Sequence, residues 1–199
     1  LGRIWYAIKA DNTNGSTREP FCGYFPIKFN SSAFLGKLFI NEFMADNTLI
    51  KDEFGETDDW VEFYNGSNEA IYMGNKYLSD DFADPQKWKL PAETMPPRSY
   101  RVFWLDNQAA QGIRHANFRL VASGEQIGLF ASVAEGYAPI DTFSFGQIQA
   151  NISWGKLPDG AGAFRALPSR TPNATNNGTT DTQNIAENTL KITPNPTNG

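Results

Sequence analysis

Cysteine and histidine are almost missing from the 199-residue sequence, which contains one of each, Cys22 and His115. A single cysteine cannot form a disulfide within the chain, and it excludes a zinc site built from cysteines. We interpret Cys22 as a buried thiol, which is the usual state of a free cysteine. Any histidine-dependent catalysis would have to use His115.

Long apolar runs and an excess of positive charge are also missing. No run approaches the roughly 18 apolar residues of a membrane-spanning helix, so we expect no membrane span. The 17 Lys and Arg are outnumbered by 22 Asp and Glu, for a net charge of −5. Binding to nucleic acid requires clustered positive charge, so this balance argues against a nucleic-acid partner. The first residues lack the pattern of a signal peptide, and we expect the sequence to be a piece of a longer one.

Strand signals dominate what is present. Short apolar or alternating runs bounded by Gly, Pro, Asn and Asp recur about every ten residues, which is typical of a sandwich or barrel. No stretch has a convincing helical period, so the predicted fold class is all-β. The predicted strands are 38–44, 60–64, 70–73, 76–78, 88–90, 100–105, 126–132, 139–145 and 163–167.

The two ends of the chain differ from this middle part. Residues 1–37 hold two strand-like runs, 4–10 and 24–29, around a turn-rich segment. The other end is rich in Asn and Thr and poor in apolar residues, which is typical of a linker. We therefore expect an N-terminal strand extension or remnant of a preceding module (1–37), a β-sandwich (38–175) and a linker with a terminal tail (176–199).

An acidic stretch runs from Asn41 to Glu62, with eight Asp or Glu and one Lys. Such a density of oxygen ligands could hold Ca²⁺, but no register supplies the spacing of an EF-hand loop. We favour a solvated loop, 51–59, that enters a strand, and we expect no metal and no cofactor. Alternation in that strand places Val61 and Phe63 on one face and Trp60 and Glu62 on the other.

A hydrolase that uses Asp106 and His115 is one alternative function. A catalytic triad would also need an exposed nucleophile, and the Gly-x-Ser-x-Gly elbow is absent. Half matches surround Ser144 and Ser153, and both lack the first glycine. We favour a structural polar group formed by Asp106, His115 and Glu125.

A carbohydrate-binding module accessory to a hydrolase is the other alternative. The sequence contains five Trp and seven Tyr, whose flat rings could stack on sugars. Large aromatic side chains are also the normal filling of a sandwich core. The five tryptophans, scattered along the chain, are Trp5, Trp60, Trp88, Trp104 and Trp154.

An ordered series of motifs between about 38 and 175 resembles the bacterial lamin tail domains. The motifs are Ile40-Asn-Glu42, Asp59-Trp-Val-Glu-Phe-Tyr-Asn65, Leu78-Ser-Asp-Asp81, Trp104-Leu-Asp106, His115-Ala-Asn-Phe-Arg-Leu120, Gly124-Glu125, Ile140-Asp141 and Ser153-Trp-Gly-Lys-Leu-Pro-Asp-Gly160. One departure is Lys156, where the family usually has Arg, and this change would weaken a bidentate contact.

The resemblance implies an immunoglobulin-like β-sandwich without a known catalytic role, found in secreted and surface proteins. It directs attention to seven residues that we expect to have structural roles: Glu42, Trp60, Glu62, Asp106, His115, Glu125 and Asp159. Glu42 and Glu62 are expected to accept hydrogen bonds from buried donors. The expected function is a non-catalytic interaction module whose partner is a protein or a cell-surface glycan.

The last twelve residues, 188–199, resemble the opening of the sorting tail used by the type IX secretion system of Bacteroidota. Their position after a polar linker supports the resemblance. It implies that the parent protein is secreted or displayed on the outer cell surface.

Overall fold

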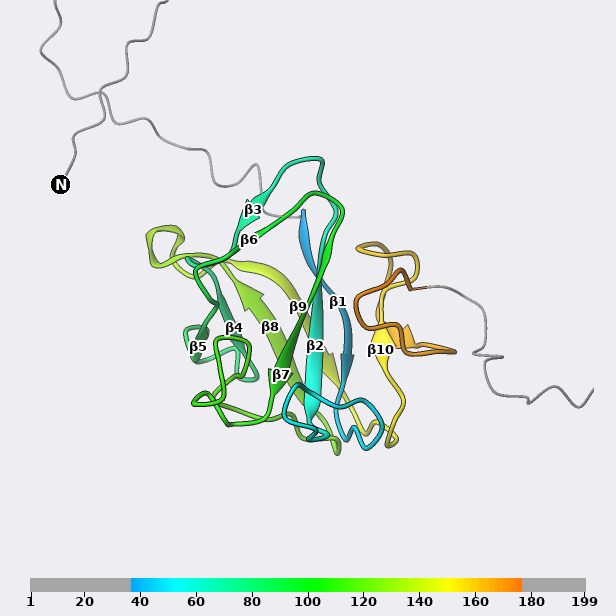
Figure 1. Ribbon diagram of the computed structural model, residues 1–199. Coiled ribbons are helices and arrows are strands. Elements are labelled where there is room, and N and C mark those ends of the chain that lie inside the picture. The colour runs from blue at the N-terminus through cyan, green and yellow to red at the C-terminus, as the bar shows by residue number, and fades with distance from the viewer. Residues whose placement is uncertain (1–36, 177–199) are drawn as a thin grey trace, which may run out of the picture. The chain divides into compact units, whose positions relative to one another are not determined.

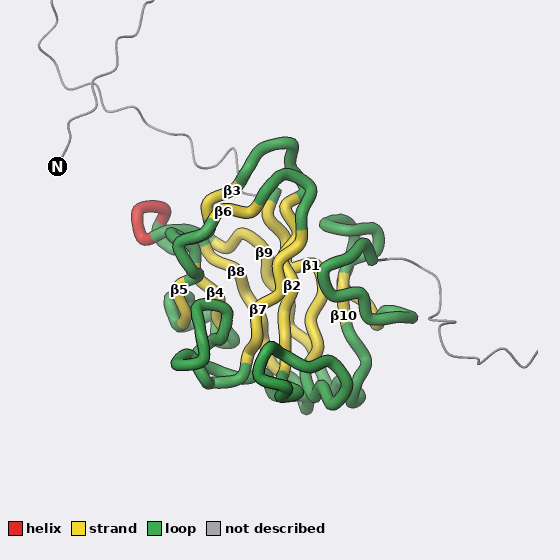
Figure 2. Tube along the Cα trace, viewed as in Figure 1, coloured by secondary structure: helices red, strands yellow, loops and turns green. Residues whose placement is uncertain are grey.

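The computed structural model describes residues 37–176. The expected strands within 1–37, Cys22 and the sorting tail at 188–199 lie outside the described residues. Figures 1 and 2 show that the described part consists of strands and loops, with one short helical turn, η2 (Val133–Glu135). No helix in the described range is long and apolar enough to cross a membrane.

The strands form two main sheets and a small ribbon, all with antiparallel neighbours. The five-stranded sheet has the order β11 (Arg165–Ala166), β10 (Trp154–Gly155), β1 (Leu38–Met44), β2 (Asp59–Asn65) and β7 (Tyr100–Leu105). The four-stranded sheet has the order β5 (Trp88–Lys89), β4 (Tyr77–Ser79), β8 (Glu125–Phe130) and β9 (Pro139–Phe145). The ribbon pairs β3 (Ile71–Tyr72) with β6 (Thr94–Met95).

One hydrophobic core joins the two main sheets. Val61 and Phe103 from the first sheet and Ile127 and Leu129 from the second are completely buried in it. Alternation along β2 and β8 supplies these side chains to the inner faces, as packing of two sheets requires. The predicted all-β, immunoglobulin-like sandwich is therefore confirmed.

The strand predictions agree with the structure where a run is long. β1, β7 and β9 have the predicted bounds, whereas β6 and β10, of two residues each, were not predicted. β8 ends at Phe130, two residues earlier than expected. The reason is local, because Ser132 caps η2: its backbone N–H and its hydroxyl both donate to Glu135 Oε2, at 3.1 and 2.7 Å.

Lys156 stands where the family usually has Arg, and its contacts show how a Lys serves at this position. Its Nζ lies 2.5 Å from Asp141 Oδ2, which also accepts a hydrogen bond from the backbone N–H of Ile40 at 2.9 Å. The same ammonium lies over the rings of Phe39 and Phe164. Lys156 thus joins β9 to β1 as a single point charge, a contact that requires no bidentate geometry.

Candidate functional site

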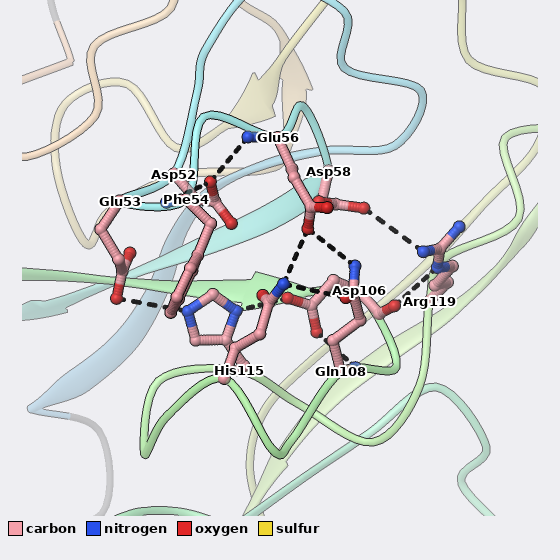
Figure 3. A network of polar contacts seen from close by, with 10 residues as sticks. Asp52, Glu53, Phe54, Glu56, Asp58, Asp106, Gln108, His115 and Arg119 are labelled. Carbon is pink, nitrogen blue, oxygen red and sulfur yellow. Dashed lines mark hydrogen bonds and ion pairs between the residues drawn. The ribbon is translucent and has the colours of Figure 1, made fainter.

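Three features lie on or beside the outer face of the five-stranded sheet. The first, which we call the His115 network, is formed by Asp52, Glu53, Glu56, Asp58, Asp106, Gln108, His115 and Arg119 (Figure 3). The second, the carboxylate cluster, is formed by Asn41, Glu42, Glu62, Asp159 and the segment 171–176. The third is a pocket between them, which we call the tryptophan pocket.

His115 is positioned by the end of β7. The backbone N–H of Trp104 donates to the carbonyl of Arg114, and that of Ala116 donates to the carbonyl of Trp104, both at 2.8 Å. These bonds place the segment that carries His115 parallel to β7. Asp106, which follows the last residue of β7, is thereby brought next to the imidazole.

Both nitrogens of His115 face carboxylates. Nδ1 is hydrogen-bonded to Asp106 Oδ2, and the two side chains are completely shielded from solvent. Nε2 lies 3.3 Å from an oxygen of the exposed Glu53. Burial alone would lower the pKa of His115, but the hydrogen bonds and charges of Asp106 and Glu53 outweigh burial and raise it. The arrangement favours a charged imidazolium that has no free nitrogen with which to activate a nucleophile.

The acidic loop, residues 45–58 between β1 and β2, is folded by hydrogen bonds to its own carboxylates and to Asp59. Asp52 Oδ1 accepts hydrogen bonds from the backbone N–H groups of Phe54 and Glu56, at 2.9 and 2.8 Å. Asp59 accepts from the backbone of Asp46 through Oδ1 and from that of Leu120 through Oδ2. These contacts fold the loop locally and attach it to the chain that follows β7.

A second set of contacts joins this loop to the 106–118 loop. Glu56 Oε2 accepts hydrogen bonds from the side-chain amides of Gln108 and Gln111, at 3.0 and 2.8 Å. Asp58 lies 3.5 Å from the guanidinium of Arg119. The acidic oxygens of Asp52, Glu56 and Asp58 come within 4.8 Å of one another, which is the spacing of a possible cation site.

In the carboxylate cluster, two buried acids lie side by side. A register shift in β1 between Ile40 and Glu42 pairs Glu42 with Glu62 of β2, and both are fully buried. Glu42 accepts hydrogen bonds from the backbone and hydroxyl of Thr171, whereas Glu62 accepts from the amide of Asn41 and the backbone of Asn173. Burial, with smaller effects of Glu42 and Asp159, raises the pKa of Glu62 to about 8.

Asp159 fastens the same segment from the other side. Its Oδ1 accepts from the Asn41 amide at 3.0 Å and from the backbone of Asn176 at 2.9 Å. Its Oδ2 accepts from the Tyr100 hydroxyl at 2.7 Å. Acceptors on β1, on β2 and in the loop after β10 therefore hold residues 171–176 against the sheet.

The tryptophan pocket, of about 210 Å³, separates the acidic loop from this segment. It is lined by Ile50, Lys51, Glu53, Trp60, Val102, Trp104, Arg114, Pro172 and Asn173. The Trp60 side chain is completely buried, and its Nε1 has no hydrogen-bond partner among the described residues. Outside the pocket, Leu49, Phe54 and Ile113 on the two loops are 52, 55 and 68% exposed.

The residues selected from the sequence fall into separate groups. Glu42, Glu62 and Asp159 meet in the carboxylate cluster, and Asp106 and His115 meet in the His115 network, with Trp60 in the pocket between the two. Glu125 does not join the Asp106–His115 pair: its carboxylate accepts from the backbone of Val121 at 2.8 Å.

Several partners of these residues were not predicted. Glu53 and Gln108 belong to the His115 network, which Gln111 contacts through Glu56, and Thr171, Asn173 and Asn176 complete the carboxylate cluster. The last three lie in a stretch rich in Asn and Thr, whose composition is that of a linker. No sequence signal marked them: Glu42 and Glu62 lie more than 100 residues before Thr171 and Asn173, and Asp159 lies 17 residues before Asn176.

Comparison with known proteins agrees with the fold. The Lamin Tail Domain family profile matches residues 31–147, which is more than half of the chain. No curated protein matches the chain. The matched range contains the five long strands, β1, β2, β7, β8 and β9, and the Asp106–His115 pair, whereas β10 and the 171–176 segment follow it. The chain belongs to the lamin tail domain family.

Proposed function

We propose that this domain is a non-catalytic interaction module of an exported bacterial protein, and that it binds a protein partner through the loops 45–58 and 106–118. Membership in the lamin tail domain family supports an interaction role. The resemblance of residues 188–199 to a type IX sorting tail supports export and a location outside the cell.

The observation that carries the proposal is the burial of His115 and the contacts of its two ring nitrogens. Its side chain is fully buried, and both of its nitrogens face carboxylates. A general base must reach the proton that it removes from a substrate or nucleophile. His115 lacks this access, so its geometry supports a structural role.

The solvent-facing side of the same loops has a different character. Leu49, Phe54 and Ile113 are each more than half exposed, and Phe54 also packs edge-on against His115 with 5.7 Å between ring centroids. The buried polar network thus gives rigid support to apolar side chains at the surface. Apolar side chains on rigid loops are suited to the desolvated centre of a protein interface.

A sugar-binding surface has less support. Stacking on a sugar requires an accessible aromatic face, whereas Trp60 is completely buried and Trp104 is 9% exposed. Trp88 and Trp154 are half-buried and pack against the core. The described tryptophans therefore serve mainly as packing.

Two measurements test the proposal. In the first, the full chain is assayed against ester, peptide and glycoside substrates, and we expect no turnover. In the second, peptides displayed on phage are selected on the wild-type chain. We expect the selected peptides to lose binding to the triple variant Leu49→Ser, Phe54→Ser, Ile113→Ser, which should still unfold in one cooperative transition.

The control variant is Val133→Ser, which removes an equally exposed apolar side chain from η2. Peptide binding should survive this change. Turnover that disappears in His115→Ala would overturn the non-catalytic assignment. Glycan-array binding that depends on Trp88 or Trp154, with no peptide binding at the loops, would establish the sugar-binding alternative instead.

A further inference from the structure

Buried oxygens without partners lie in the acidic loop and in the 106–118 loop that it contacts. Asp52 Oδ2, Asp58 Oδ2 and Gln111 Oε1 are shielded from solvent and have no hydrogen-bond partner among the described residues. Gln111 is bound through its Nε2 to Glu56, and Glu56 lies beside both aspartates. Buried acceptors are almost always satisfied in proteins, so the orphaned oxygens of the neighbouring Asp52 and Asp58 call for a ligand.

The charge of the region points to the kind of ligand. Asp52, Glu56 and Asp58 bring three carboxylates together, and Asp106 adds a fourth beside Asp52. Two cations lie nearby. Arg119 is 3.5 Å from Asp58, and both nitrogens of His115 already face the carboxylates of Asp106 and Glu53. A water molecule donates only two hydrogen bonds and brings no charge, whereas a cation can serve several carboxylates at once.

The spacing of the oxygens fits a particular class of ion. One carboxylate oxygen each from Asp52, Glu56 and Asp58 lies within 4.8 Å of the other two. Calcium binds oxygens at about 2.3 to 2.6 Å, so ligands across the ion are separated by up to about 5 Å. The three carboxylates can therefore surround one Ca²⁺, with water completing its coordination.

A second group, formed by Asp52, Asp106 and His115, meets the same distance criterion. It contains a nitrogen, which would suit zinc. However, Nδ1 of His115 is hydrogen-bonded to Asp106, and Nε2 faces Glu53. The imidazole would have to give up one of these partners to bind zinc, so the all-oxygen site is favoured.

We propose that Asp52, Glu56 and Asp58 form a Ca²⁺ site that orders the acidic loop, whose Glu56 also binds Gln108 and Gln111 of the 106–118 loop. The sequence did not predict this site, because no EF-hand spacing is present. Its ligands converge instead through a turn at Asp52, whose Oδ1 accepts two backbone N–H groups and whose Oδ2 is left free. The proposal does not depend on the proposed protein-binding function.

Calorimetric titration of the EDTA-treated full chain with CaCl₂ tests the site. We expect a dissociation constant of about 10⁻⁴ to 10⁻³ M, the range of extracellular calcium modules. The melting temperature should rise with the Ca²⁺ concentration, since the ion binds the folded state. MgCl₂ should bind more weakly, because Mg²⁺ demands a tighter octahedral site.

The variant Asp52→Asn should weaken Ca²⁺ binding by about tenfold or more, because it removes a ligand charge and keeps Oδ1 for the turn. Asp58→Asn is a second variant for the same purpose. The control is Asp84→Asn, which changes an exposed aspartate between β4 and β5 and should bind Ca²⁺ as the wild type does. Without Ca²⁺, Asp52→Asn should melt at or above the wild-type temperature, because one of several like charges is removed.

Three outcomes would overturn the proposal. One is the absence of both heat and melting shift at about 10 mM CaCl₂, well above the expected dissociation constant. Another is unchanged Ca²⁺ affinity in both Asp52→Asn and Asp58→Asn. The third is tight binding of ZnCl₂ that is lost in His115→Ala, which would assign the metal to the nitrogen-containing group.

Discussion

Nδ1 of His115 is hydrogen-bonded to Oδ2 of Asp106, and neither side chain has any exposed surface. Asp106 also accepts a hydrogen bond from the backbone N–H of Gln108 at 2.8 Å, and Arg119 donates to its carbonyl at 2.7 Å. One buried pair thus connects the end of β7 to the turn at 106–108 and to the 114–119 segment. This position makes the pair a fastening point for the loops.

Replacing His115 should destabilise the domain. In His115→Ala the buried carboxylate of Asp106 loses its partner, a change that typically costs about 3 to 5 kcal/mol. At roughly 2 to 4 °C per kcal/mol for a chain of this size, the melting temperature should fall by roughly 6 °C or more. Differential scanning calorimetry measures the change.

A double variant separates the buried charge from the lost packing. His115→Ala combined with Asp106→Asn removes the uncompensated charge, so it should be more stable than His115→Ala alone. If His115→Ala melts like the wild type, the pair is not the fastening point described above.

The buried Glu62 should make stability depend on pH. Its pKa is about 8 in the folded protein and near the ordinary value of 4.5 in the unfolded chain. Between these values the folded state holds a proton that the unfolded state releases, so stability falls as pH rises through this window. Chemical denaturation at pH values from about 5 to 9 should show the fall.

Glu62→Gln should show a smaller fall across the same window, since its side chain does not titrate. The exposed Glu69 offers a matched control, because Glu69→Gln should keep the wild-type pH dependence. His115 contributes in the same direction, since its pKa is also raised, and it is unchanged in both variants. Identical pH profiles for Glu62→Gln and the wild type would refute the assignment.

The segment 171–176 should be part of the folded domain although it lies beyond the family match. A chain that ends at 176 should melt like the full chain. A chain that ends at 170 loses Thr171 and Asn173, which donate to the buried Glu42 and Glu62, at about 1 to 3 kcal/mol for each lost donor. Its free energy of unfolding should therefore fall by about 2 kcal/mol or more, and equal stability of the two truncated chains would contradict this.

The loss of stability on replacing a core side chain with Ala should increase with the burial of that side chain. Phe103 and Leu129 are completely buried, so Phe103→Ala and Leu129→Ala should each cost about 2 to 5 kcal/mol. Phe143 is only partly buried, on edge strand β9, where it stacks on Phe164. Phe143→Ala should cost less than either, as urea denaturation can measure.

The alternation of residues along the sequence was sufficient to predict the long strands of this protein. In β2, alternation separates Val61 and Phe63, which face the core, from Trp60, which packs with Met44 and Trp104 on the other face. Each residue in such a strand contributes to one repeating signal, and burial of one face depends on that signal alone. The all-β class and the inward positions of β2 and β7 could therefore be predicted without coordinates.

The partners of the polar residues required the folded chain. Glu42 faces Glu62 because of a register shift in β1, and their donors come from a segment with the composition of a linker. A two-residue strand such as β10 has no period, and β10 forms because β1 offers a neighbouring edge. Hydrogen bonds between residues far apart in sequence depend on where the backbone returns, and no local preference of Asp, Glu or Asn encodes that position.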